Sequence, residues 1–225
     1  MAASLRPPER SDLWKELRTG VELLRLPAKS PKLATAPRGD GSIVVAVPGF
    51  GATDISMRPM RGYLKSLGWR AVDWGQGRND GQVEPLRDAL LERVERLATP
   101  ERPVAMVGWS LGGVLAREVA RDRPDLVRRV VTYGTPLAGG PRYTNGARRY
   151  DPAEIDRIEE LIEERNQTPI RVPVTAMYSK NDGIVAWRAC LDDDPNTEMI
   201  EVSSSHIGMG IDPDVWRIVA DRLAR

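Results

Sequence analysis

Short apolar runs alternate with amphipathic segments along most of this chain. The runs fall at 43–47, 69–74, 104–109, 127–133, 174–178 and 198–202, and the first of them, IVVAV, is fully apolar and rich in β-branched residues. Continuous apolar runs of this length are typical of strands that are buried on both faces of a parallel sheet. The segments 56–67, 83–97, 111–121 and 212–223 instead repeat apolar residues at helical spacing. Strands that alternate with helices predict an α/β fold, with a mostly parallel central sheet and helices on both faces.

Two segments stand outside this alternation. Residues 1–42 precede the first strand and contain an amphipathic helix over 11–26, in which Ser11 or Asp12 can cap the N-terminus. Such a helix around Trp14 can dock on the sheet, mediate contacts in a homo-oligomer or touch a membrane, and docking is the commonest outcome. Residues 135–172 exceed the length of one crossover and carry a charged helical run, so we expect a short cap-like insertion within one domain over 43–225.

Composition narrows the class of protein. Of the 225 residues, 41% are hydrophobic and 29% charged, as in a soluble globular domain, so disorder is not expected as the main state. The net charge of +1 lacks the basic excess of a nucleic-acid binder. No apolar stretch is long enough for a transmembrane segment, and the first 30 residues lack the apolar core of a secretory signal. We therefore expect a cytoplasmic protein that binds no nucleic acid.

Counting the reactive residues limits the chemistry further. The single cysteine, Cys190, excludes an intrachain disulfide and a cysteine-based zinc site. The single histidine, His206, excludes any site that needs two histidine ligands. The dinucleotide and P-loop phosphate-binding motifs are absent as well, since the glycines at 75 and 77 have no third glycine that opens a helix. The sequence therefore predicts chemistry without a metal or a cofactor.

One motif combines a nucleophile with the local structure that such a nucleophile needs. Residues 108–112 read Gly-Trp-Ser-Leu-Gly, directly after the third predicted strand and at the start of a helix. In a G-x-S-x-G turn between strand and helix, the two glycines let the chain pass close to itself while the serine side chain projects outward. The free N–H groups at the start of the helix favour negative charge nearby. Ser110 is therefore the candidate nucleophile.

Five motifs together resemble the α/β-hydrolase superfamily, and its serine esterases and lipases in particular. They are GWSLGG at 108–113, VPGFG at 47–51, YGTP at 133–136, SKNDGIV at 179–185 and SSSHIGM at 203–209. They occur in the order of the family, and the resemblance extends from about Ile43 to the C-terminus. It implies the α/β-hydrolase fold and a nucleophile, acid and base in the chain order Ser, Asp, His.

The partners of Ser110 follow from acid–base chemistry. A serine hydroxyl needs a base to take its proton, and the imidazole is the side chain suited to that near neutral pH. His206 follows the last predicted strand, in a serine-rich loop at the same sheet edge. The acid that orients it is expected to be Asp182, in the turn after the fifth strand. Asp151 and the run Asp192 to Asp194 are competing acids that lie farther from a strand end.

The resemblance also implies an oxyanion hole, formed by the backbone N–H groups of Phe50 and Leu111. Pro48 replaces a histidine that is frequent in the family, but the donor lies two residues later, so the change should cost little. Arg78 and Asn79 also follow a strand, and could contact the substrate or brace the oxyanion loop. Trp187 follows the acid loop and could line the pocket or belong to the core.

These residues favour a serine hydrolase that acts on small-molecule carboxylic esters through an acyl-enzyme. The same triad supports an acyltransferase or a thioesterase, which differ in the acyl donor or acceptor. A hydrolase-fold protein that only binds ligands is the alternative from another class. The charged, short insertion at 135–172 favours small or medium esters over triacylglycerol.

Overall fold

A six-stranded parallel sheet forms the centre of the molecule, in the order β2-β1-β3-β4-β5-β6. The structure is a computed structural model and describes residues 5–29 and 31–225. The strands are β1 (Ile43–Val47), β2 (Arg70–Asp73), β3 (Val104–Trp109), β4 (Val127–Tyr133), β5 (Val174–Tyr178) and β6 (Thr197–Glu201). Every described pair of neighbouring strands is parallel. The predicted strands are confirmed, each to within one residue.

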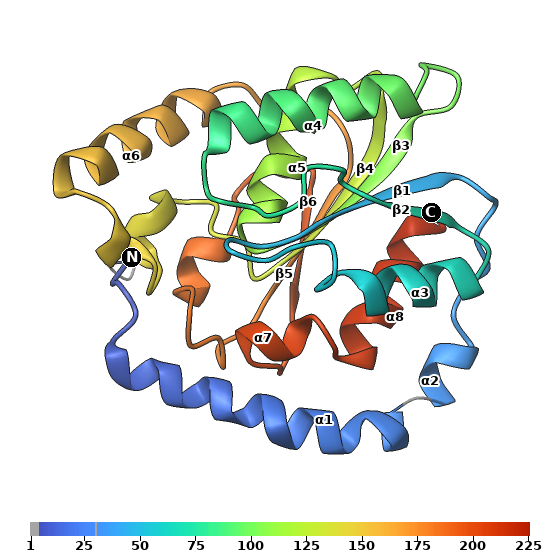
Figure 1. The fold of residues 1–225 in the computed structure, drawn as a ribbon, viewed down its shortest axis with the longest axis horizontal. Helices are drawn as coiled ribbons and strands as arrows, with labels where there is room; N and C mark the ends of the chain where they lie inside the picture. Colours follow the sequence, from blue (N-terminus) through green and yellow to red (C-terminus); the bar gives the residue numbers. More distant parts are fainter. Residues whose placement is uncertain (1–4, 30) are drawn as a thin grey trace.

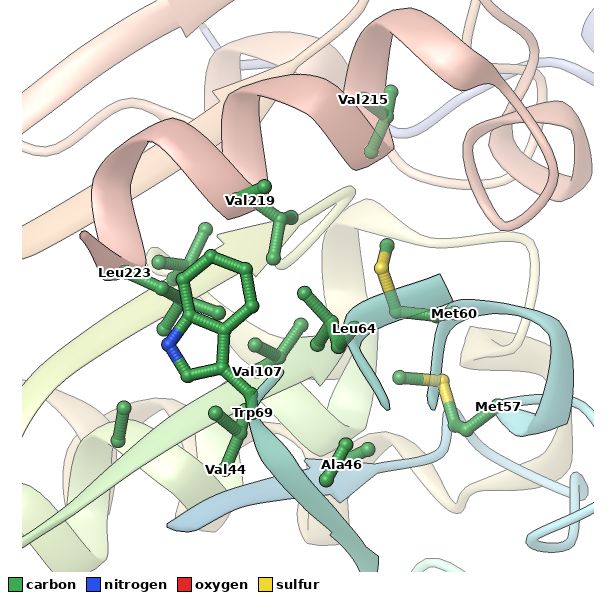
Figure 2. Close-up of a cluster of buried hydrophobic side chains, with 14 of the residues drawn as sticks. Val44, Ala46, Met57, Met60, Leu64, Trp69, Val107, Val215, Val219 and Leu223 are labelled. Atoms are coloured by element: carbon green, nitrogen blue, oxygen red, sulfur yellow. The ribbon is translucent and has the colours of Figure 1, made fainter. Parts of the chain in front are cut away.

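Alternate residues of the strands build two apolar cores, one on each face of the sheet. In β1, Val44 and Ala46 pack under α3 (Arg58–Ser66) and α8 (Pro213–Leu223), a core that Figure 2 shows around Trp69. Val45 and Val47 point the other way, toward α4 (Val83–Leu97) and α5 (Leu111–Asp122). Burial on both faces explains why β1 carries a continuous apolar run, whereas the edge strands β2 and β6, which are less buried, include charged residues.

The helices begin where capping and proline chemistry favour it. In α8, the side chain of Asp212 accepts a hydrogen bond from the N–H of Asp214, and Pro213 occupies the first turn. Asp151 caps α6 (Pro152–Asn166) in the same way, through the N–H of Ala153. The helices expected at 56–67, 83–97, 111–121 and 212–223 are confirmed, with ends that differ by up to two residues.

The N-terminal segment differs from the single helix predicted over 11–26. A 3-10 helix, η1 (Arg10–Leu17), leads into α1 (Arg18–Lys29), and α2 (Pro31–Ala34) follows. Figure 1 shows this segment in blue along one edge of the molecule, beside the short helix α7 (His206–Met209). Residues 1–4 and 30 of the predicted extension 1–42 lie outside the described residues.

The predicted insertion, residues 135–172, contains η2 (Gly140–Tyr143), η3 (Ala147–Arg149) and α6. Figure 1 shows α6 at the periphery, apart from the central strands. The helix is held to α5 by ion pairs from Arg165 to Glu118 and Asp122. No helix among the described residues is long and apolar enough to cross a membrane.

Candidate active site

Ser110 occupies a backbone conformation that side chains rarely adopt. Its φ of 53° and ψ of −126° make it the one residue other than glycine with positive φ in the described part of the chain. The N–H of Ser110 donates to the carbonyl of Tyr133 at 2.9 Å, which ties the turn between β3 and α5 to the end of β4. The side chain is half-buried. A strained turn held by its surroundings is the geometry predicted from the G-x-S-x-G motif.

Glycines let four pieces of backbone meet around this turn. A Cβ on Gly108 would collide with the backbone of Gly113, and one on Gly112 would collide with the carbonyl oxygens of Val47 and Pro48. Because Gly112 has no Cβ, the start of α5 can lie directly against the end of β1. On the other side, a Cβ on Gly49 would lie 3.2 Å from the Cβ of Ser110. The loop after β1 therefore runs directly beside the serine.

His206 and Asp182, the predicted base and acid, are in direct contact. The Nδ1 atom of His206 lies 2.7 Å from Oδ2 of Asp182, and both side chains are almost fully buried. The other oxygen, Oδ1, accepts the N–H groups of Ile184 at 2.8 Å and Val185 at 2.7 Å. A carboxylate only accepts, so Nδ1 carries the proton and Nε2 of the neutral ring is left as the acceptor.

The loop that carries His206 has to cross two strand ends to reach the serine. Ser110 follows β3 and His206 follows β6, and three strand spacings of about 4.8 Å separate these strands. Gly134, at the end of β4, makes the approach possible: a Cβ there would lie 2.9 Å from Nδ1 of His206. The ring of Trp109 also contacts the imidazole, with centroids 5.8 Å apart. Among the described residues, no hydrogen bond joins Ser110 to His206, and such bonds are often long before substrate binds.

The surroundings of His206 favour its protonated form. Burial alone lowers the pKa of a histidine, but the charge and hydrogen bond of Asp182 and the charge of Glu16 raise it. The net result is a pKa of His206 above its ordinary value. A base that is strengthened in this way is suited to accept a proton from a hydroxyl group.

Two backbone N–H groups next to the serine turn, one in the loop after β1 and one at the start of α5, are without a partner. The N–H groups of Phe50 and Leu111 make no hydrogen bond within the described part of the chain. The loop itself is braced by Asn79, whose Nδ2 donates to the carbonyl of Pro48 at 2.9 Å and whose backbone bonds Gly51 and Ala52. Free, fixed N–H groups beside a nucleophile are the arrangement that stabilises an oxyanion.

The three tentative substrate contacts have different surroundings. Asn79 is fully buried, so the structure favours the bracing role over the substrate contact. Arg78 is exposed, and its Nη2 lies 3.9 Å from where a Cβ of Gly51 would be, above the oxyanion loop. Trp187 stacks on Tyr178 at 5.8 Å between ring centroids and lies under the guanidinium of Arg188. It lines a groove between the acid loop and the N-terminal segment.

The competing acids have other partners. Asp151 caps α6, as described above, and Asp192 forms a mostly buried ion pair with Arg117 at 2.7 Å. Asp194 accepts the N–H of Asn196 within its own turn. No cluster of three or more metal-ligating side chains occurs in the described ranges.

Sequence reasoning missed one group in the site. Glu16, on the N-terminal helix, accepts the backbone N–H of His206 at 3.0 Å and that of Gly183 at 2.9 Å. The signal in the sequence is that polar residues recur at helical spacing, at Asp12, Glu16, Thr19 and Glu22, opposite an apolar stripe. That pattern does not say which loop the residues contact.

Comparison with known proteins identifies the family and the fold. A model of the alpha/beta hydrolase family matches residues 44–223. No curated protein sequence matches significantly. Among solved structures, alpha/beta hydrolase domain-containing protein 10 from mouse is 19% identical, with a TM-score of 0.59 over 83% of this chain and 91% of that one. The monoacylglycerol lipase of Paleococcus ferrophilus is 17% identical, with a TM-score of 0.61 over 84% and 96%. A thioesterase domain from the curacin biosynthetic pathway is 15% identical, with a TM-score of 0.58 over 84% and 93%. Identities this low establish the common fold alone.

Proposed function

Because the chain belongs to the alpha/beta hydrolase family, we propose that it is a serine hydrolase that cleaves small-molecule carboxylic esters. The observation that carries the proposal is the 2.7 Å contact between Nδ1 of His206 and Asp182 at the sheet edge where Ser110 turns. A buried carboxylate that fixes the tautomer of the only imidazole in the chain has a direct use in activating a hydroxyl group.

The first half of the reaction acylates the serine. Oγ of Ser110 attacks the carbonyl carbon of the ester, and its proton moves to Nε2 of His206. The carbonyl oxygen becomes negative and accepts the N–H groups of Phe50 and Leu111. When the tetrahedral intermediate collapses, the bond to the alcohol oxygen breaks, and the leaving alkoxide takes the proton from Nε2. Asp182 stays ionised and stabilises the imidazolium between these two transfers.

The second half releases the acid. A water molecule gives a proton to Nε2 of His206, and its oxygen attacks the acyl carbon. The same two N–H groups stabilise the second oxyanion. Collapse then breaks the bond to Oγ of Ser110, which recovers its proton from Nε2. Arg78, exposed beside the loop after β1, and Trp187, in the groove beside the acid loop, remain the candidates for a substrate contact.

Labelling with a fluorophosphonate probe tests the proposal. The wild-type chain should label and hydrolyse short p-nitrophenyl esters, and Ser110→Ala should do neither. Ser56→Ala is the matched control, because Ser56 bonds only the carbonyl of Thr53 and the variant should label normally. A folded wild-type chain that does not label would favour a ligand-binding protein with the same fold.

A substrate series separates the acyl-transfer alternatives. Acyl chains of increasing length, offered as oxygen esters and as thioesters, should be hydrolysed fastest as small or medium oxygen esters. A product analysis with added alcohol or thiol detects transfer in place of hydrolysis. Faster turnover of thioesters, or acyl transfer as the main reaction, would overturn the ester assignment and leave the role of Ser110 intact.

A further inference from the structure

The N-terminal helix, which here means the continuous pair η1 and α1, attaches to the domain by a polar side. Between residues 12 and 22, the partly buried positions are Asp12, Lys15, Glu16, Thr19 and Glu22. They recur every three or four residues, as the inner side of a docked helix does, but all of them are polar. Hydrogen bonds therefore hold this helix to the domain, whereas most docked helices are held by apolar packing.

One carboxylate on that side joins the two loops that carry the acid and the base. Oε1 of Glu16 accepts the N–H of Gly183 at 2.9 Å and the N–H of His206 at 3.0 Å. Its other oxygen, Oε2, accepts the N–H of Ile207 at 2.9 Å. Gly183 is the residue after Asp182, so Glu16 connects the backbone beside Asp182 to the backbone of His206 itself.

The approach of the helix to the acid loop requires a residue without a side chain. A Cβ on Gly183 would collide with the carbonyl oxygen of Asp12 and would come within 3.1 Å of Oε1 of Glu16. Glu22 anchors the same helix to the His loop one residue earlier, because its carboxylate accepts the N–H of Ser205 at 2.9 Å and the hydroxyl of Ser205 at 2.8 Å. The two glutamates therefore differ in their contacts: Glu16 binds the backbone of the acid loop and of His206, whereas Glu22 binds Ser205 and, among the described residues, accepts from neither Gly183 nor His206.

Glu16 also acts on the charge of the imidazole. The titratable groups that face the ring are Asp182 of the acid loop and Glu16 of the helix, and the packed neighbours Trp109 and Gly134 carry none. Burial lowers the pKa of His206, and these two carboxylates raise it. The helix thus contributes a second negative charge, and that charge is held in place by three N–H donors.

We propose that Glu16 is a positioning residue: it holds the Asp182 loop and His206 in register, and it stabilises the imidazolium that forms when Ser110 gives up its proton. This role rests on the proposed function. It is distinct from the triad, because Glu16 touches the backbone of His206 and not its ring.

Glu16→Gln tests the role with Glu22→Gln as the matched control. Glutamine keeps one oxygen for Gly183 and His206, but its amide nitrogen cannot accept from Ile207. The value of kcat for Glu16→Gln should fall by about 10- to 100-fold with little change in KM. Glu22→Gln removes the same charge from the same helix and should lose stability without that loss of kcat.

The single histidine gives a direct second measurement. In protein without a histidine tag, the imidazole resonances belong to His206 alone, so NMR reads its pKa without assignment. The pKa should fall in Glu16→Gln and stay in Glu22→Gln. Glu16→Asp keeps the charge but shortens the reach, so kcat should fall while the pKa of His206 remains raised.

The outcomes separate this role from the function on which it rests. A wild-type chain that does not react with a fluorophosphonate overturns the proposed function, and with it the role of Glu16. A reactive wild-type chain whose kcat and His206 pKa are unchanged by Glu16→Gln overturns the role of Glu16 alone. Equal losses of kcat in Glu16→Gln and Glu22→Gln overturn it too, since the helix would then act only as support.

The outer side of the same helix carries a separate signal. Its exposed stripe is apolar and consists of Leu13, Trp14, Leu17, Val21 and Leu24. Trp14 is 73% exposed and Leu24 82%. A stripe of this kind on one amphipathic helix is typical of a surface that meets another apolar phase.

Two arginines lie next to the stripe in sequence, and the exposed acid nearby, Glu9, is engaged in the cap of η1. Arg10 and Arg18 are exposed and form no ion pair within the described residues. The acidic groups of the inner side are already engaged: Asp12 pairs with Lys15 at 2.8 Å, and Glu16 and Glu22 accept backbone N–H groups. A second copy bound through this stripe would face the same unpaired arginines, whereas anionic headgroups would neutralise them.

From this charge pattern we infer that the stripe docks on the surface of an anionic lipid bilayer. The helix would lie in the interface with Trp14 and the leucines below the headgroups and the arginines among them. This inference stands apart from that for Glu16, since it rests on the opposite side of the helix.

Sedimentation with vesicles tests the docking. The wild-type chain should sediment with phosphatidylcholine vesicles that contain 30% phosphatidylserine, and less with phosphatidylcholine alone or at high salt. Leu17→Glu should weaken binding by about 10- to 100-fold. Ile55→Glu is the matched control, because Ile55 is equally exposed on another part of the surface and the variant should bind normally. Absence of sedimentation, equal losses in both variants, or a dimer in solution that Leu17→Glu dissociates would overturn the lipid assignment.

Discussion

Ser110→Gly and Ser110→Ala both remove the nucleophile, and the glycine variant should be the more stable of the two. The φ of 53° and ψ of −126° at Ser110 lie where a side chain is unfavourable and glycine is not. Holding a residue in such a region costs about 1–3 kcal/mol. Glycine also lowers the free energy of unfolding by about 0.4–1 kcal/mol, because its unfolded chain has more conformational entropy. The free energy of unfolding of Ser110→Gly should therefore exceed that of Ser110→Ala by about 1 kcal/mol.

Thermal and urea unfolding of the two variants measure the difference. In a chain of this size, 1 kcal/mol corresponds to about 2–4 °C in Tm. Alanine is the correct reference because it removes the hydroxyl and keeps the Cβ. Ser56 supplies the opposite control: its φ is not positive, so Ser56→Gly should be less stable than Ser56→Ala. If Ser110→Gly melts at or below Ser110→Ala, the turn stores no strain and the reasoning fails.

Three further predictions concern charge. Asp182→Asn should lower kcat/KM by about 10⁴-fold, because Nδ1 of His206 loses its carboxylate partner; steady-state kinetics with normal circular dichroism would check this. Activity needs the neutral imidazole. Burial lowers the pKa of His206, but Asp182 and Glu16 raise it overall, so kcat/KM should fall on acidification with a midpoint above about pH 6.5. A midpoint below that value would contradict the assignment. Asp192→Ala leaves Arg117 buried without its partner and should lower the free energy of unfolding by about 3 kcal/mol in urea. Burial raises the pKa of Asp192, but the charge of Arg117 and the hydrogen bonds that Asp192 accepts lower it overall. The ion pair therefore stabilises the fold above about pH 4, and below that pH the difference in free energy of unfolding between wild type and Asp192→Ala should become smaller.

Much of the fold could be predicted because burial on both faces leaves a direct mark in the sequence. Val44 and Val45 belong to different cores, and both must be apolar, so β1 reads as a continuous run. The candidate site was predictable for a related reason. The loops after β3, β5 and β6 leave the same edge of a parallel sheet, and this brings Ser110, Asp182 and His206 to one side.

The contacts that tie distant segments together could not be predicted. Asn79 was open to two interpretations, and only the position of Pro48 in space shows that its amide is used inside the protein. Gly134 reads as part of an ordinary turn until His206 is found against it. Glu16 lies 190 residues from His206 in sequence, and local periodicity says nothing about a contact of that range.

The span of that contact has a consequence for synthesis on the ribosome. Glu16 is made long before the amides that bind it, which follow 167, 190 and 191 residues later at 183, 206 and 207. Until these amides exist, the carboxylate of Glu16 lacks its N–H donors, and the helix with its apolar stripe is attached to an incomplete sheet. The nascent chain should therefore stay inert toward esters until the loops of Asp182 and His206 have emerged, and it should acquire reactivity in one step as the helix closes over them.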